Sequence, residues 1–210
     1  MLDGAMRRVI DPVVNRWGRA LAARGWTANG VTLLGLGLGL AAAAVLAFGW
    51  PGAVALILLL ASRLADGLDG AVARATQKTD FGGYLDIVCD FLFYGAVPLA
   101  FALRDPGGNA VAAAFLLASF YANGSSFLAY AILAAKHGME TSDRGEKSLY
   151  FTPGLLEGTE TIGFFALLCL WPTGFAPLAW VFGILCFYTC ASRVWLAWRV
   201  FGQAITASRN

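Results

Sequence analysis

The sequence predicts an all-α, polytopic membrane protein with six transmembrane helices and an amphipathic surface helix before them. Of the 210 residues, 59% are hydrophobic and only 13% are charged, and the mean hydropathy is +0.67. A soluble domain must cover its core with polar surface, for which this chain has too few charged residues. The composition also excludes a disordered protein, and a net charge of +2 is too small to indicate a nucleic-acid partner.

Residues 1–24 are predicted to form an amphipathic juxtamembrane helix, and residues 25–210 a six-helix transmembrane domain. The first segment interleaves arginines with apolar residues and has no uninterrupted apolar stretch. Such a pattern is typical of a helix that lies along a membrane surface. Pro12 is expected to start or kink this helix.

Apolar segments of about 20 residues, the length that crosses the hydrocarbon of a bilayer, then recur along the chain. Because backbone polar groups cannot remain unpaired in lipid, each segment is expected to be a helix. Short turns at 49–52, 105–109 and 171–174 predict antiparallel hairpins. The predicted transmembrane helices are 29–49, 52–74, 83–104, 108–135, 153–171 and 175–199.

The distribution of positive charge predicts the orientation. Of the 15 Lys and Arg residues, all but Arg63, Arg104 and Arg193 fall in the N-terminal arm, the second-to-third loop, the fourth-to-fifth loop or the tail. Positively charged loops stay in the cytoplasm, so both termini are expected there.

Two glycines of the first span, Gly35 and Gly39, form a G-x-x-x-G pattern. Such a pattern lets another helix approach closely, either from the same chain or from a second copy. The alternative is that these are glycines of the kind found generally in membrane helices.

Four aspartates stand where the second span ends and the third begins, and ionisable groups in such segments indicate function because they are costly there. Asp66 and Asp69 are three residues apart and Asp86 and Asp90 four apart, so each pair shares one face of its helix. The hairpin is expected to bring the two pairs together. Carboxylates so close require compensation, and oxygen ligands favour Mg²⁺, Mn²⁺ or Ca²⁺, with Cys89 pointing away. A centre with two metals would suit displacement at phosphorus.

Small residues beside these acids indicate room for a substrate. Gly70 removes a side chain next to Asp69, and Ala73 keeps the same face clear. Arg74 is suited to pair with a phosphate or with one of the acids. The alternative to a functional site is a set of ion pairs with Arg74 and Lys78 that only fixes the hairpin. Two cations do not balance four acids, so this interpretation leaves an excess of negative charge.

This segment resembles the signature of the CDP-alcohol phosphatidyltransferase family, which reads D-x-x-D-G-x-x-A-R, a spacer, then G-x-x-x-D-x-x-x-D. Its fixed positions are occupied by Asp66, Asp69, Gly70, Ala73, Arg74, Gly82, Asp86 and Asp90. The spacer is slightly shorter than the family's, which we interpret as a shortened loop. The run TANGVT at 27–32 is similar to the family's T-P-N-x-x-T, with Ala28 in place of proline.

The resemblance implies transfer of a phosphatidyl group from CDP-diacylglycerol to the hydroxyl of a small polar alcohol, with release of CMP, in phospholipid biosynthesis. It implies two divalent ions, Mg²⁺ or Mn²⁺, with Asp66, Asp69, Asp86 and Asp90 as ligands and Asp90 also as general base. It also implies a homodimer, expected in the inner membrane of a bacterium with the active site facing the cytoplasm. The implied contacts to the CDP-lipid are Asn29, Thr32, Asp66, Gly70, Ala73, Arg74 and Lys78.

The candidate acceptor-binding residues are Arg144, Lys147, Glu157 and Arg193. A phosphorylated alcohol such as glycerol 3-phosphate would need converging cations, and this is the favoured interpretation. Serine would instead need an acid for its ammonium and a cation for its carboxylate, which Glu157 and Arg193 would supply. Glu157, Glu160 and Arg193 would equally form a salt-bridge lock between the fifth and sixth spans.

A membrane transporter or docking protein is the alternative class of function. A transporter is expected to show internal repeats and helices broken at mid-membrane, whereas these acids stand at one cytoplasmic hairpin. A docking protein would not need small residues beside Asp69.

Overall fold

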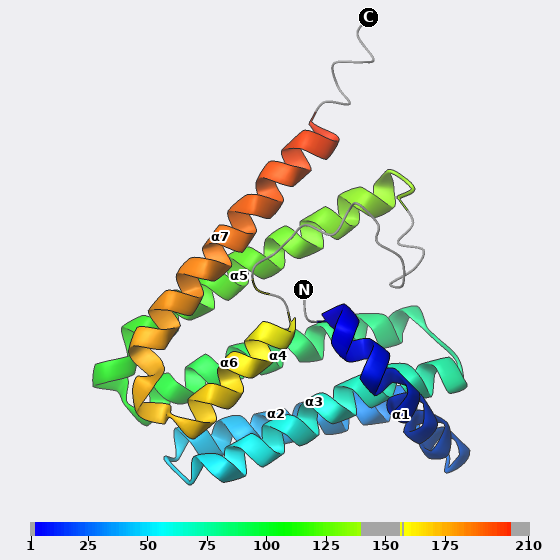
Figure 1. Ribbon diagram of the computed structural model, residues 1–210, viewed down its shortest axis with the longest axis horizontal. Helices are drawn as coiled ribbons and strands as arrows, with labels where there is room; N and C mark the ends of the chain where they lie inside the picture. Colours follow the sequence, from blue (N-terminus) through cyan, green and yellow to red (C-terminus); the bar gives the residue numbers. More distant parts are fainter. Residues whose placement is uncertain (1–2, 140–155, 157, 203–210) are drawn as a thin grey trace, which may run out of the picture.

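The computed structural model describes residues 3–139, 156 and 158–202, and these residues form helices and short connections without a strand. Figure 1 shows the helices in chain order. They are α1 (Asp3–Ala23), α2 (Ala28–Ala47), α3 (Gly52–Ala75), α4 (Asp80–Arg104), α5 (Pro106–Lys136), α6 (Gly158–Leu170), the short 3₁₀ helix η1 (Pro172–Gly174) and α7 (Phe175–Phe201).

Local sequence signals place the helix ends. The hydroxyl of Thr27 accepts a hydrogen bond from the Gly30 amide at 3.1 Å, and Thr79 caps α4 in the same way through the Gly82 amide at 3.0 Å. Asp105 caps α5, whose first residue is Pro106. These caps satisfy amide groups that a helix leaves unpaired at its start. The helices break at the predicted turns 49–52, 105–109 and 171–174, and the described helix ends lie within a few residues of the predicted ones, while the predicted start of the fifth span at 153 lies outside the described residues.

The helices pack in two groups. Helix α2 packs against both α3 and α4 on one side of the molecule, α5 and α7 lie side by side on the other, α6 lies against α3, and α5 also contacts α4 (Figure 1). Aromatic rings join the groups: Phe101 of α4 stacks on Phe175 of α7 at 4.4 Å between centroids, and Phe93 of α4 meets Phe165 of α6 edge to face at 5.8 Å. This apolar core holds the position of α4, which carries two of the predicted site residues.

Gly35 and Gly39 of α2 pack closely against other helices of the same chain. A Cβ added at Gly39 would lie 2.6 Å from a ring carbon of Phe93 and 3.0 Å from the hydroxyl of Ser62. One at Gly35 would lie 3.3 Å from the carbonyl oxygen of Ser62. The pattern thus brings α2 close to α3 and α4, as small residues do between membrane helices.

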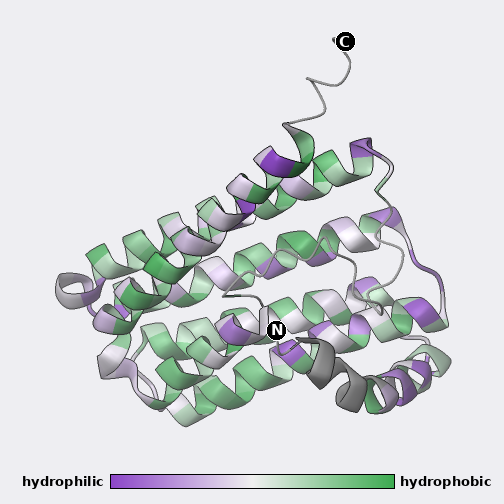
Figure 2. Cartoon of the chain, turned by 45° about the horizontal axis from the view of Figure 1, so that its top comes forward, coloured by the Kyte–Doolittle hydropathy of each residue, from purple (hydrophilic) through white to green (hydrophobic). Residues whose placement is uncertain are grey.

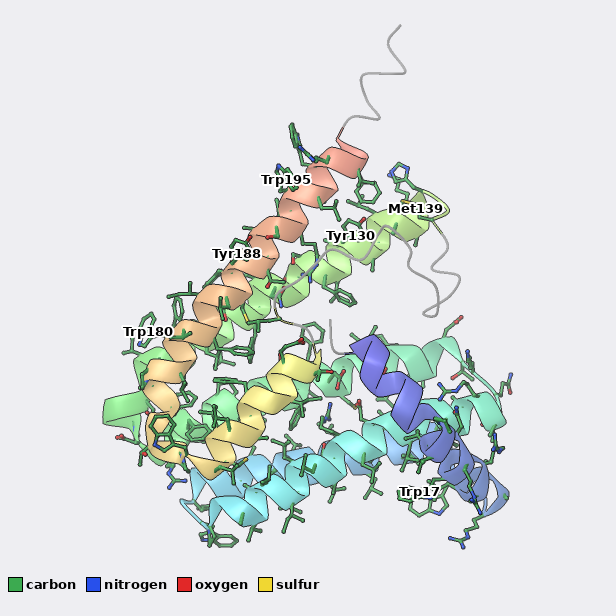
Figure 3. The ribbon with its side chains drawn as sticks, in the orientation of Figure 1. Trp17, Tyr130, Met139, Trp180, Tyr188 and Trp195 are labelled. Atoms are coloured by element: carbon green, nitrogen blue, oxygen red, sulfur yellow. The ribbon has the colours of Figure 1, made fainter. Side chains whose placement is uncertain are left out.

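Four helical segments are long and apolar enough to cross a membrane: α2, α4, α5 and Pro172–Phe201. Figure 2 shows that hydrophobic residues extend along most of the length of these helices. Large side chains on their outer faces are exposed, including Trp180, Tyr188 and Trp195 along α7 (Figure 3). Lipid would cover such side chains.

The count of six spans remains a prediction. Helix α3 matches the predicted span 52–74 in length, but Arg63, Asp66 and Asp69 make it more polar than the four segments above. For the predicted span 153–171, the described helix α6 has 13 residues.

Residues 1–24 were expected to form one helix, and α1 covers most of them. Pro12 lies inside α1 and does not start it. Val14 is buried and Gly18 lies against Ala71 of α3, while Arg16 is exposed. Helix α1 therefore packs on the end of α3 that carries the acidic residues, and its position on a membrane surface remains a prediction.

The close approach at Gly39 makes a matched pair of substitutions informative. Gly39→Ala should lower stability by about 1–3 kcal/mol, because the added methyl group overlaps the buried Phe93 ring. Gly37→Ala on the same helix, where a Cβ meets nothing within 4 Å, should leave stability unchanged or raise it by up to about 1 kcal/mol, because alanine favours helix. Thermal unfolding of the purified protein in detergent measures both. Equal unfolding midpoints for the two variants would contradict this packing.

Candidate active site

Two helices joined by a short turn position the acidic residues. Asp66 and Asp69 stand on one face near the end of α3, and Asp86 and Asp90 on one face near the start of α4. Helix α3 ends at Ala75 and α4 begins at Asp80, where Thr79 caps it, so only a short turn separates the two pairs of acids. The hairpin was predicted to bring the two pairs of carboxylates together, and Asp66, Asp69 and Asp86 do lie together.

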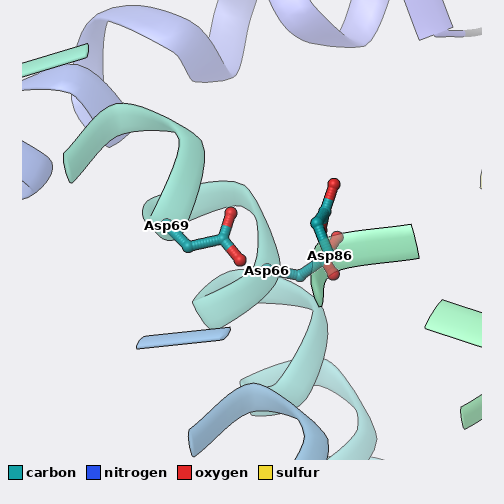
Figure 4. A group of neighbouring side chains, drawn as sticks. All are labelled: Asp66, Asp69 and Asp86. Atoms are coloured by element: carbon teal, nitrogen blue, oxygen red, sulfur yellow. The ribbon is translucent and has the colours of Figure 1, made fainter. Parts of the chain in front are cut away.

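Three of the carboxylates form a compact group. Asp66, Asp69 and Asp86 each offer an oxygen, and these oxygens lie within 4.8 Å of one another (Figure 4). Asp69 is buried, and the other two are half-buried. The Thr32 hydroxyl of α2 donates a hydrogen bond to Asp69 Oδ2 at 2.6 Å. Thr32, predicted to contact the CDP-lipid, therefore contacts a carboxylate of the acidic group, so three helices build the site.

This acidic group fits a hard divalent cation. Its donors are carboxylate oxygens, which Mg²⁺ and Mn²⁺ prefer, and it contains neither His nor Cys. Oxygens this close repel one another when ionised, and a bound cation removes that repulsion. Asp66, Asp69 and Asp86 are the residues that would hold it.

Asp90 has a different partner. Its Oδ1 accepts a hydrogen bond from Arg63 Nη1 at 2.8 Å, and the same nitrogen lies 3.4 Å from Asp66 Oδ1. Asp90 is thus joined to the acidic group through Arg63, which sequence analysis placed within a span without assigning it a role. The sequence could have indicated this role, because Arg63 stands three residues before Asp66 and this spacing puts both side chains on one helix face.

The guanidinium of Arg74 lies beside Gly70, the small residue that follows Asp69. A Cβ added at Gly70 would meet only Arg74 Nη1, at 3.4 Å. Arg74 is exposed, and its Nη2 and Nε donate to Asn15 Oδ1 of α1 at 2.8 and 3.3 Å. Arg74 therefore lies over Gly70 and is held by the N-terminal helix, a contact that sequence analysis did not predict.

The remaining residues predicted to bind the CDP-lipid surround the same hairpin. Ala73 is half-buried on α3, and Lys78 is exposed in the turn between α3 and α4. Asn29 lies close to the start of α4, because its Oδ1 would be 3.3 Å from a Cβ added at Gly82.

Of the residues predicted to bind the acceptor, Arg144, Lys147 and Glu157 lie outside the described residues. Arg193 of α7 is described, and its Nη1 donates to the Asn123 side-chain oxygen at 2.8 Å and to the Ser126 hydroxyl at 2.7 Å. These hydrogen bonds fasten α7 to α5. Glu160 lies in the first turn of α6.

Comparison with known proteins identifies the family of this chain and proteins with a similar fold. The chain is 49% identical over 195 residues to the inner membrane protein YnjF of Escherichia coli strain K12. The aligned residues make up 93% of this chain and 94% of that protein. Its fold is similar to the crystal structure of Mycobacterium tuberculosis phosphatidylinositol phosphate synthase (PgsA1) with CDP-DAG bound, with a TM-score of 0.68, 23% identity and coverage of 89% of this chain and 94% of that one. The structure of the same synthase in complex with manganese and citrate gives a TM-score of 0.67, 22% identity and 88% coverage of both chains. The family profile of CDP-alcohol phosphatidyltransferases matches residues 26–198. This chain belongs to the CDP-alcohol phosphatidyltransferase family.

Proposed function

We propose that this protein transfers a phosphatidyl group from CDP-diacylglycerol to the hydroxyl of a small polar alcohol and releases CMP. The observation that carries the proposal is the group of Asp66, Asp69 and Asp86, whose oxygens lie within 4.8 Å of one another at the α3–α4 hairpin. Membership of the CDP-alcohol phosphatidyltransferase family supports the class of reaction. The similar fold of a synthase described with CDP-DAG, and also with manganese, is in keeping with the donor and the metal.

In this proposal Asp66, Asp69 and Asp86 hold divalent ions, Mg²⁺ or Mn²⁺. When bound, such ions neutralise the diphosphate of the donor and favour displacement at its phosphorus. Thr32 orients the Asp69 carboxylate through its hydrogen bond. Arg74, which lies over Gly70, contacts the diphosphate, as a guanidinium is suited to do.

Asp90 is the proposed general base. It takes the proton of the acceptor hydroxyl, and the acceptor oxygen forms a bond to the β-phosphorus of CDP-diacylglycerol. The bond between this phosphorus and the bridging oxygen breaks, and CMP leaves with that electron pair. The phosphate stays on the lipid, so the reaction needs no covalent intermediate on the protein.

The proposed acceptor is a phosphorylated alcohol, such as glycerol 3-phosphate. Arg193 supports this choice, because an arginine in a membrane helix is costly and here it is held in place by Asn123 and Ser126. Arg144 and Lys147 are the further cations proposed to meet the phosphate. Serine is the second acceptor to test, with Glu157 and Arg193 as its partners.

The proposed location is the inner membrane of a bacterium, with both termini and the acidic group on the cytoplasmic side. The clustering of Lys and Arg in the N-terminal arm and in alternate loops supports this orientation. The likeness to an inner membrane protein of Escherichia coli supports the location. A homodimer and the division into residues 1–24 and 25–210 remain predictions.

Release of CMP by the purified full-length protein tests the reaction. CDP-diacylglycerol and Mg²⁺ or Mn²⁺ should yield CMP only when a suitable acceptor is present, and EDTA should stop the release. Asp69→Asn should reduce turnover at least about 100-fold, because it removes a charged ligand. Asp80→Asn is the matched control, since Asp80 is exposed in the first turn of α4. Turnover in Asp69→Asn equal to that of the control would refute the metal site.

Asp90→Asn separates catalysis from binding. Turnover should fall at least about 100-fold, because an amide cannot take the proton of the acceptor. The dissociation constant for CDP-diacylglycerol should change by less than about threefold, since Asp66, Asp69 and Asp86 are unchanged. Calorimetry and CMP release measure the two quantities. A variant that keeps wild-type turnover would remove Asp90 from the role of base.

A panel of acceptors tests the role of Arg193. Arg193→Gln should raise the KM of a phosphorylated acceptor about tenfold or more, because it removes a charge-assisted contact to phosphate. The KM of CDP-diacylglycerol should stay the same. Arg199→Gln, an exposed arginine of the same helix that packs on Trp195, is the control. If Arg193→Gln lowers the unfolding temperature but leaves the KM of every acceptor unchanged, Arg193 is a lock between helices instead.

A further inference from the structure

Arg63 is a buried cation of α3 whose guanidinium reaches acids of both α3 and α4. Its side chain is only 10% exposed, and it lies on the helix that carries Asp66 and Asp69. A charged side chain in this setting is retained when it is paired or has a role. Its Nη1 joins acids from both helices, at 2.8 Å from Asp90 Oδ1 and 3.4 Å from Asp66 Oδ1.

Side chains of α3 and α4 contact the guanidinium, and α2 holds one of them, Ser62, in place. Its Nη2 donates to the Ser62 hydroxyl at 3.1 Å, and this buried hydroxyl donates in turn to the Gly35 carbonyl of α2 at 2.7 Å. The guanidinium carbon stands 4.1 Å from the ring centroid of Phe93 on α4, which is fully buried. Such contacts suit the planar guanidinium better than the flexible ammonium of lysine. The Arg63 side chain is therefore a fixed support for Asp90.

The charge of Arg63 also acts on the metal ligands. A divalent cation bound by Asp66, Asp69 and Asp86 would lie close to the positively charged Arg63 guanidinium. The repulsion between the two charges would lower the affinity of the site for the metal. The same guanidinium donates the hydrogen bond that holds the Asp90 carboxylate. One side chain thus influences both the proposed base and the affinity of the neighbouring carboxylates.

We propose that Arg63 is a positioning residue, which orients Asp90 for proton transfer and limits the affinity of the neighbouring carboxylates for divalent cations. The first half of this inference rests on the proposed function, whereas the second half concerns binding of metal alone. Removing the charge of Arg63 should therefore lower kcat but raise the affinity for divalent cations.

Mn²⁺ binding to the metal-free full-length protein provides the test, alongside CMP release. Arg63→Gln should bind Mn²⁺ about tenfold more tightly, because the repulsion between guanidinium and metal is gone. Its kcat should fall about 10- to 100-fold, because Asp90 loses its support. Arg63→Lys keeps the charge, so Mn²⁺ affinity should stay within about threefold of wild type while kcat still falls. Arg104→Gln is the control, since Arg104 lies at the far end of α4 beside the Leu46 carbonyl.

A double variant tests whether Arg63 acts through Asp90. Arg63→Gln should lower the kcat of Asp90→Asn by less than about threefold, because the group that it positions is already lost. A structural role alone would instead weaken Mn²⁺ binding and lower the unfolding temperature together. Folding of each variant is checked by thermal unfolding with and without Mn²⁺, because a ligand that binds the folded state raises the unfolding temperature.

Unchanged or weaker Mn²⁺ binding in folded Arg63→Gln would overturn the inference. Should that variant not fold, Arg63→Lys decides, because full kcat in Arg63→Lys also overturns it. Absence of CMP release by the wild-type protein would refute the proposed function and with it the role toward Asp90. The Mn²⁺ measurement would still decide whether Arg63 controls metal affinity.

Discussion

Repulsion among carboxylates at one hairpin is the constraint around which this protein is arranged. Asp66, Asp69 and Asp86 bring oxygens within 4.8 Å of one another at buried and half-buried positions, and Asp90 stands one turn further along α4. Such a group persists when positive charge and hydrogen-bond donors balance it. Thr32 and Arg63 are among the donors to these acids, and a divalent cation bound by the group would add positive charge. The acidic group is therefore better explained as a binding site than as a structural ion pair.

The rest of the fold holds the two helices of this hairpin at a fixed distance. Gly35 and Gly39 let α2 lie directly against α3 and α4, and this brings Thr32 to Asp69. The same contact places Phe93 beside both Gly39 and Arg63, so helix packing and the orientation of the guanidinium depend on one ring. The aromatic core then joins α4 to α6 and α7. Apolar packing thus fixes α4, the helix that carries Asp86 and Asp90.

Hydropathy and residue spacing were enough to predict the helices, their turns and the shared faces of the acids. These features depend on local sequence, since segment length, caps and three- or four-residue spacing each act within one helix. The pairing of Asp90 with Arg63 was not predicted, because it depends on how α4 is rotated relative to α3. The contact of Arg74 with Asn15 was missed for a similar reason, since residues distant in sequence meet there. The partner of Gly35 and Gly39 was left open by sequence and is settled by the packing of α2 within the chain.

The position of bound manganese is the most direct test of this account. Diffraction from crystals of the full-length protein soaked with Mn²⁺, recorded at the manganese absorption edge, locates the ion independently of any assay. We expect an anomalous peak coordinated by oxygens of Asp66, Asp69 and Asp86. A protein that shows no peak there, or that binds Mn²⁺ only at other residues, would contradict the central claim that this hairpin is a metal-dependent active site.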